Sequence, residues 1–319
     1  MNECLVTKLR GVVDDNSILK LGEIRIVRNN RTPVPDRNIV SFTEKQTITI
    51  LNNGTFENGS NILVVPANTR VNITASEGSI ISIPNKYAIK TFNIDCYDFD
   101  IEHDIKQFSY CEYLNDLIIY GTKNTEGNLN SISKLNLNNL EIMGSNLIGN
   151  ISDIKNMSGL KRLILINNNH ITGDTSAIQS LNLDTISIYG NSMLRSNIEF
   201  LTRKTTLRDL IMYKNSGYIY GDLSKLNTEA AFISFYGTES RFTWTKRIDG
   251  GKIFGMEYAN LGDYVDTMLI DLAALDINYT PSDREWFKKI LVYGNRTSAS
   301  DSAVSALQEK GITILILNK

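Results

Sequence analysis

The sequence is poor in the residues that most often carry catalytic or metal chemistry. It has two histidines, His103 and His170, and three cysteines that form no Cys-x-x-Cys pair. A histidine-based catalytic dyad or a zinc site needs such residues grouped closely, so neither is expected. No phosphate-binding loop motif is present. We therefore expect no enzyme activity, no metal and no cofactor.

Other shortages limit where the chain works and what it binds. Its odd number of cysteines predicts reduced thiols in a protein folded in a cytoplasm. No segment approaches the roughly 18 uninterrupted apolar residues of a membrane span. The first ten residues lack the long apolar stretch of a signal peptide, and none is expected. A net charge of −2 argues against nucleic acid as a partner.

Proline is scarce, with five in 319 residues, and its placement divides the chain. Two prolines and four charged residues lie in 28–37, which predicts a linker. Residues 1–37 are expected to form an extended N-terminal anchor segment with that linker. Residues 38–90 alternate apolar and polar positions around Asn-Gly turns, which predicts a small β module. Residues 91–319 are expected to form one repeat array.

The array restarts one motif, in which positions 1, 4 and 6 are apolar. Its starts are Thr91, Leu114, Leu137, Leu160, Leu183, Leu207, Ala230, Ile253, Phe287 and Ile312. Most starts are spaced in the low twenties, and a fixed period in this range indicates a repeat architecture. Positions 4 and 6 are expected in the core, position 5 on the other face with exposed aliphatic residues, and a polar side chain at position 9 inside the turn. Helical spacing in 263–319 predicts a helical C-terminal cap.

The stretch 160–170, Leu-Lys-Arg-Leu-Ile-Leu-Ile-Asn-Asn-Asn-His, resembles the leucine-rich repeat family. The Gly-[Asn/Asp]-[Ile/Leu] that follows each strand is more similar to bacterial members than to plant ones. The resemblance implies an α/β-type, β-rich repeat solenoid with a parallel β-sheet on its concave face. The β module would precede this array, and the anchor segment would precede the module.

Position 7 of the motif carries six tyrosines in ten copies, although only 14 of 319 residues are tyrosine. One interpretation is structural, because stacked aromatic side chains stabilise neighbouring strands. The other is a binding stripe, because exposed tyrosines anchor proteins and sugars. The candidate binding residues are Tyr97, Tyr120, Tyr189, Tyr213, Tyr236 and Tyr293.

The N-terminal stretch, from Met1 to Ile26, resembles the N-terminal segment of virion and fibre-like proteins of crAss-like phages that infect Bacteroides. The residues that carry this resemblance, and with it a role as anchor on the particle, are Asn2, Glu3, Cys4, Leu5, Val6, Thr7, Lys8 and Leu9. The sequence thus predicts a virion decoration or fibre protein, made in the host cytoplasm, that holds other virion proteins and adheres to a host surface glycan or protein. It could form homo-oligomers. The alternative is a cytoplasmic protein–protein interaction module of bacterial or phage origin.

Overall fold

The computed structural model is β-rich, with parallel sheets and few helices. Its residues form two compact units: Met1–Gly149, Asn156–Leu160 and Asn167–Asn169 make the first, and Asn150–Lys155, Lys161–Ile166 and His170–Lys319 make the second. The segment boundaries expected after residues 37 and 90 stay predictions. The structure describes residues 24–28, 38–51, 60–73, 80–95, 99–100, 105–120, 126–168, 170–191, 193–201, 209–213, 218–225, 232–235, 239–246, 255–275 and 288–318.

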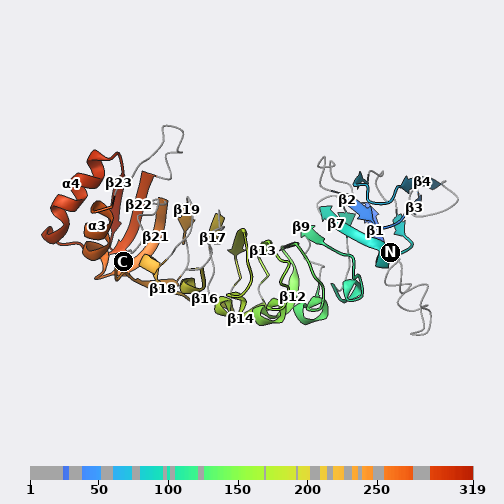
Figure 1. Cartoon of the computed structure of the whole chain (residues 1–319), viewed down its shortest axis with the longest axis horizontal. Helices are drawn as coiled ribbons and strands as arrows, with labels where there is room; N and C mark the ends of the chain where they lie inside the picture. Colours follow the sequence, from blue (N-terminus) through green and yellow to red (C-terminus); the bar gives the residue numbers. More distant parts are fainter. Residues whose placement is uncertain are drawn as a thin grey trace. The chain divides into compact units, whose positions relative to one another are not determined.

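The first unit contains an antiparallel sheet with the strand order β4-β3-β6-β1-β8. Three of its strands, β1, β3 and β4, are labelled in Figure 1. Its strands are β1 (Ile24–Arg28), β3 (Gln46–Leu51), β4 (Ser60–Val65), β6 (Ile80–Ile83) and β8 (Phe99–Asp100). The side chains of Ile48 and Ile50 are buried while Thr47 next to Ile48 is exposed. This alternation is the period of a strand that buries one face, as the sequence predicted.

Strand β7 (Ile89–Asp95) is where the first unit changes from antiparallel to parallel pairing. It pairs antiparallel with β2 (Ile39–Phe42), which in turn pairs with β5 (Val71–Asn72). On its other side β7 pairs in parallel with β9 (Asp116–Tyr120), and β9 with β11 (Asn139–Met143). A second parallel pair joins β10 (Glu126–Asn128) and β12 (Asn146–Asn150).

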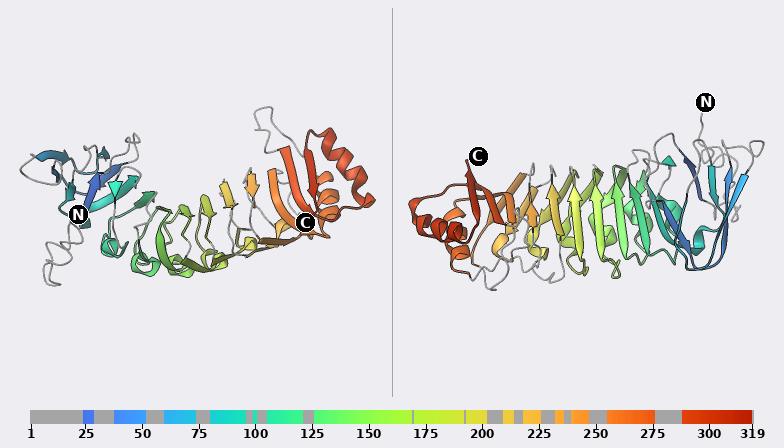
Figure 2. Two further views of the ribbon diagram at one scale, coloured as in Figure 1. Left: turned by 180° about the vertical axis from the view of Figure 1, so that it is seen from behind. Right: turned by 90° about the horizontal axis from the view of Figure 1, so that it is seen from above.

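The second unit contains two runs of parallel strands, each with more strands than the parallel pairings of the first unit. Strands of its longer parallel run lie side by side in both views of Figure 2. This run consists of β13 (Arg162–Ile166), β15 (Thr185–Tyr189), β17 (Asp209–Tyr213), β19 (Phe232–Ser234), β21 (Gly255–Gly262), β22 (Lys289–Gly294) and β23 (Thr313–Leu317). Its second run consists of β14 (His170–Asp174), β16 (Met193–Asn197), β18 (Tyr218–Asp222) and β20 (Glu239–Thr243).

The core of each repeat comes from the positions that the sequence predicted. Leu117 and Ile119 of β9, like Leu140 and Ile142 of β11, are no more than 1% exposed. A short 3-10 helix contributes a second buried pair, such as Leu129 with Ile132. These helices are η2 (Lys86–Ala88), η3 (Ile105–Phe108), η4 (Leu129–Ile132), η5 (Ile151–Ile154), η6 (Thr175–Ile178), η7 (Ile198–Leu201), η8 (Leu223–Lys225) and η10 (Ser298–Ser300).

The Gly-[Asn/Asp] pair that precedes the 3-10 helices has a role that the sequence analysis missed. The side chain of Asn150 accepts a hydrogen bond from the backbone of Ser152, and Asp174 accepts one from Ser176. Each thus caps the free N–H groups at the start of its helix. Gly173 has a φ of 101°, and a Cβ there would lie 2.4 Å from Oδ1 of Asn150. Glycine is therefore required both by the backbone conformation and by the cap of the preceding repeat.

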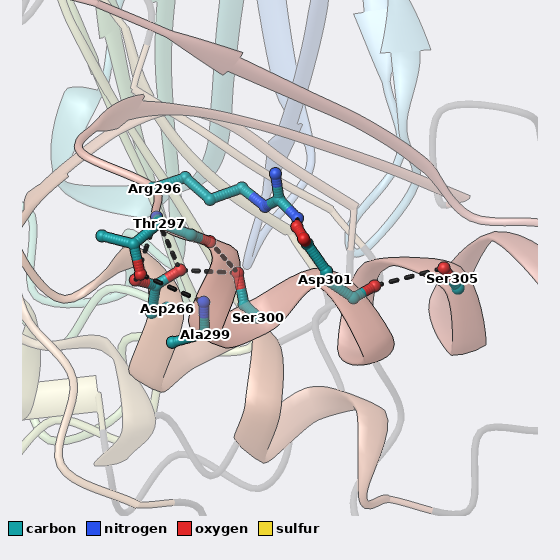
Figure 3. A network of polar contacts seen from close by, with 7 residues as sticks. All are labelled: Asp266, Arg296, Thr297, Ala299, Ser300, Asp301 and Ser305. Carbon is teal, nitrogen blue, oxygen red and sulfur yellow. Dashed lines mark hydrogen bonds and ion pairs between the residues drawn. The ribbon is translucent and has the colours of Figure 1, made fainter.

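Two α-helices, α3 (Val265–Ala273) and α4 (Asp301–Glu309), pack together in the second unit. Asp266 of α3 joins them, because its carboxylate accepts hydrogen bonds from the hydroxyls of Thr297, at 2.6 Å, and Ser300, at 2.5 Å (Figure 3). Arg296 also forms an ion pair with Asp301. The sequence predicted both helices; their role as a cap stays a prediction.

Candidate binding surface on the parallel sheet

Positions 5 and 7 of the motif lie on the face of the parallel strands opposite positions 4 and 6. Tyr120 of β9 and Tyr293 of β22 are both half-buried there. The backbones of Tyr189 and Tyr213 are paired neighbours in β15 and β17. Because paired strands lie about 4.8 Å apart, these two tyrosines are adjacent along the sheet, as expected.

Tyr97 and Tyr236 lie outside the described residues, as does the whole anchor, Asn2 to Leu9. Strand pairing nevertheless corrects the repeat register around Tyr97. Phe92 pairs with Leu117, Ile94 with Ile119, and Asp95 with Tyr120. Asp95 therefore occupies position 7 of this copy, which starts at Ile89 and not at Thr91. The error arose because this first copy, which extends from Ile89 to the next start at Leu114, is longer than the regular period.

The register also differs near the C-terminus, where the sequence placed Ala259 and Asn318 at position 7. Asn260 pairs with Tyr293, and Tyr293 with Leu317, so Asn260 and Leu317 hold that position. The cause in β21 is a bulge at Tyr258, whose φ of 61° is in the left-handed region. An extra residue in one strand shifts every later residue by one place.

The bulge brings Tyr258 beside Tyr293, with ring centroids 6.2 Å apart and an interplanar angle of 39°. The sequence analysis missed Tyr258, because unbroken spacing assigned it to the buried position 6. The neighbouring Gly262, at the other irregularity in the same strand, is a signal that a change of register was possible. The aromatic surface therefore contains a residue that repeat alignment alone does not place there.

Tyr120 is fixed by Glu141, which follows it on the neighbouring strand at position 5. The Tyr120 hydroxyl donates a hydrogen bond to a Glu141 carboxylate oxygen, and Glu141 is only 4% exposed. A hydrogen bond between neighbouring strands holds the tyrosine ring in one orientation. A fixed ring loses little conformational entropy when it contacts a ligand.

Two aliphatic residues at position 5 are less exposed than the sequence predicted. Ile164 of β13 is 6% exposed and Leu291 of β22 is 7% exposed. The expectation of exposed aliphatic side chains is therefore wrong at these two positions. On the described part of this face, Tyr120 and Tyr293 are half-buried and carry polar hydroxyls, and Leu315 of β23, which pairs with Leu291, is 43% exposed.

Buried amides support the strand ends beneath this face. Asn168 and Asn191, at position 9, are fully buried and donate to the carbonyl oxygens of Ile142, at 2.9 Å, and Leu165, at 2.7 Å. This is the internal ladder that the sequence predicted. Asn295 occupies the same position in another copy but is exposed and bonds to Asp263. Buried position-9 amides thus bond to backbone carbonyl groups in the central copies, whereas Asn295, in the copy that starts at Phe287, does not.

Within the described ranges, no three acidic, histidine or cysteine side chains are grouped so that they could hold a metal ion. His170 is exposed at the start of β14, and His103 lies outside the described residues. No described helix combines the length and apolar character that crossing a membrane requires. The contacts that the described sheet face offers a ligand include the aromatic rings and hydroxyl groups of its tyrosines.

No protein-family model matches the chain, and no curated protein matches it. Among solved structures, the chain is similar to a plant peptide hormone receptor, RGFR1, in complex with RGF2. The identity is 13%, the TM-score is 0.38, and the match covers 72% of this chain and 48% of the receptor chain. The chain therefore spans about half the length of that receptor.

Proposed function

We propose that this chain is a binding protein without catalytic activity, built on a leucine-rich-repeat solenoid. Its parallel sheet presents the position-7 tyrosines to a host surface glycan or protein. The observation that carries the proposal is the neighbouring placement of Tyr189 and Tyr213 on paired strands, with Tyr258 beside Tyr293 further along the same sheet. Rigid aromatic groups with a polar tip are efficient contacts for both classes of ligand.

The biological setting that we propose is a phage particle. The resemblance of residues 2–9 to virion proteins supports an N-terminal anchor, by which the chain would hold other virion proteins. Many copies on one particle would each bind weakly, and the particle would gain its adhesion from their number. The same sheet would serve the alternative function, a cytoplasmic module that binds a protein partner.

The binding proposal is tested by a double variant, Tyr189→Ser with Tyr213→Ser. We expect its affinity for host cells or their surface polysaccharide to fall at least about tenfold, because two central aromatic contacts are removed. Tyr264→Ser is the matched control, since Tyr264 is 42% exposed but precedes α3. Unchanged binding by a folded double variant would leave the tyrosines with only a role in sheet stability.

The setting is tested separately by mass spectrometry of purified phage particles. We expect the chain to be present, and a version without residues 2–9, which leaves β1 intact, to be absent from particles while still folding. Incorporation of the shortened chain would contradict the anchor. Absence of the full chain from particles would favour the cytoplasmic module.

A further inference from the structure

Three tyrosines and one glutamate line an open pocket in the first unit. The pocket has a volume of about 440 Å³ and is lined by Tyr87, Tyr110, Glu112 and Tyr113. Tyr110 is 72% exposed and Tyr113 is 58% exposed. The volume lies within the range of small-molecule sites, about 300–1,000 Å³.

The loop that carries Tyr110 and Tyr113 is held rigidly from below. Phe108, Cys111 and Leu114 are at most 1% exposed and fix the loop at every third residue. Successive backbone hydrogen bonds join Cys111 N to Phe108 O at 2.9 Å, Glu112 N to Tyr110 O at 3.0 Å, and Leu114 N to Cys111 O at 2.9 Å. The two tyrosines and Glu112 are therefore presented on a fixed backbone, which lowers the entropic cost of binding.

The opposite wall is fixed in the same way. Oδ1 of Asn85 accepts a hydrogen bond from the backbone N–H of Tyr87 at 3.2 Å, and the same amide donates to Glu44 at 2.8 Å. The two walls are tied together where Asn115 N donates to Lys90 O at 2.8 Å. The relative position of Tyr87 and the Tyr110 loop is thus set by the fold of the first unit.

The fold itself does not require the aromatic residues. The loop 155–160 has the same length and places Asn156 and Gly159 where the first copy has Tyr110 and Tyr113. It forms the corresponding hydrogen bonds, with Ser158 N donating to Asn156 O at 2.8 Å and Leu160 N donating to Met157 O at 2.9 Å. The loop forms these hydrogen bonds both with Tyr110 and Tyr113 and with Asn156 and Gly159. The two tyrosines are therefore not needed for the loop conformation.

We propose that this pocket binds a neutral sugar ring. Tyrosine rings pack against the apolar face of a sugar, and the carboxylate of Glu112 accepts hydrogen bonds from its hydroxyls. A cationic ligand is disfavoured, because Nζ of Lys86 already lies over the Tyr87 ring, 5.5 Å from its centroid. Such a ligand would compete for that ring and meet a like charge, whereas a neutral sugar meets neither obstacle.

This pocket shares no lining residue with the position-7 tyrosines. Tyr87, Glu112 and their neighbours belong to the first unit, whereas Tyr189 and Tyr213 belong to the second. Variants of the pocket residues test the sugar pocket, and variants of Tyr189 and Tyr213 test the proposed function. Failure of one proposal would therefore be distinguishable from failure of the other.

The test is saturation-transfer NMR on the full chain with methyl glycosides of glucose, galactose, mannose and N-acetylglucosamine as probes. The test variant combines Tyr110→Asn with Tyr113→Gly, because Asn156 and Gly159 occupy these two places in the equivalent loop. Tyr264→Ser is the matched control for loss of an exposed tyrosine. Tetramethylammonium serves as the cationic probe.

We expect at least one glycoside to bind the parent chain and the control at millimolar concentrations. The double variant should bind it at least about tenfold more weakly, because two aromatic contacts are lost. Glu112→Gln should weaken binding less, since an amide oxygen still accepts hydrogen bonds. The proposal is overturned if no glycoside binds the parent chain, if the double variant binds equally well, or if tetramethylammonium alone binds.

Discussion

The side-chain amide of Asn191 donates a hydrogen bond to the carbonyl oxygen of Leu165, in the preceding repeat, over 2.7 Å. Both groups are in the second unit, and Asn191 is fully buried. Replacing Asn191 with alanine would leave a buried carbonyl without this partner. We expect the free energy of unfolding to fall by about 1–3 kcal/mol, measured by urea denaturation.

The control for that variant is Asn295→Ala, at the same motif position but on the surface. Its cost should stay within about 0.5 kcal/mol. Equal losses from the two variants would show that burial of the amide is not what matters.

Gly173 is expected to tolerate no side chain. Gly173→Ala combines an unfavourable φ of 101° with a Cβ placed 2.4 Å from Oδ1 of Asn150. Gly311→Ala separates the two effects, because φ there is 80° and nothing lies within 4 Å of its Cβ. We expect about 1–2 kcal/mol of destabilisation at Gly311 and clearly more at Gly173. Similar denaturation midpoints for the two variants would contradict a role for the Asn150 contact.

Asp266 should make the packing of α3 and α4 dependent on pH. Burial alone would raise the pKa of its carboxyl, but hydrogen bonds from Ser300 and Thr297 and the charge of Arg296 outweigh it, so the pKa is lowered. A carboxyl whose folded pKa lies below its unfolded value stabilises the fold above the unfolded pKa, about 4. That contribution is lost as the pH falls through the folded pKa.

The measurement compares the thermal stability of the parent chain with that of Asp266→Asn. At pH 7 we expect a loss of about 1 kcal/mol or less, because Asp266 is only half-buried and water screens its charge. Near pH 3 the difference should shrink. A difference of the same size at both pH values would exclude the carboxylate as its source.

Cys111 should resist alkylation while the chain is folded. Burial raises the pKa of its thiol to about 11, and the nearby positive charge of Lys86 offsets this only in part. Only the thiolate reacts quickly, so at pH 8 the native residue should stay unmodified by iodoacetamide. Mass spectrometry of the peptide that contains Cys111 should show full modification after denaturation. Rapid labelling before denaturation would mean that the loop opens readily.

The central repeats could be predicted from sequence because their spacing has no interruptions. Apolar residues at positions 4 and 6 recur there every 23 or 24 residues, and the strands pair in the implied register. The prediction failed where the chain inserts residues, at the long first copy and at the Tyr258 bulge. Periodicity counts residues and cannot reveal which one leaves the strand, because that depends on local backbone conformation.

The sugar pocket was not predicted, although the sequence contains a signal for it. Tyr110 and Tyr113 fall outside the strand motif, so alignment on positions 1, 4 and 6 gives them no weight. Comparing them with Asn156 and Gly159 shows that the first copy departs from a later one at these two places. That Tyr87 faces the same pocket depends on the packing of η2 beside the loop, which no spacing within the array encodes.

The contact of Asn150 with Gly173 has a consequence for how the length of this chain can change. The capping side chains of Asn150 and Asn197 fit against a glycine one repeat later, Gly173 and Gly221, so each cap and its glycine must keep their spacing. Removing one whole central repeat would keep every such pair together. Removing a single residue between Asn150 and Gly173 would shift the cap, the glycine and the buried positions out of register with the neighbouring repeats. We therefore expect insertions and deletions in the central array to be tolerated as whole repeats, and smaller ones only where a bulge can absorb them.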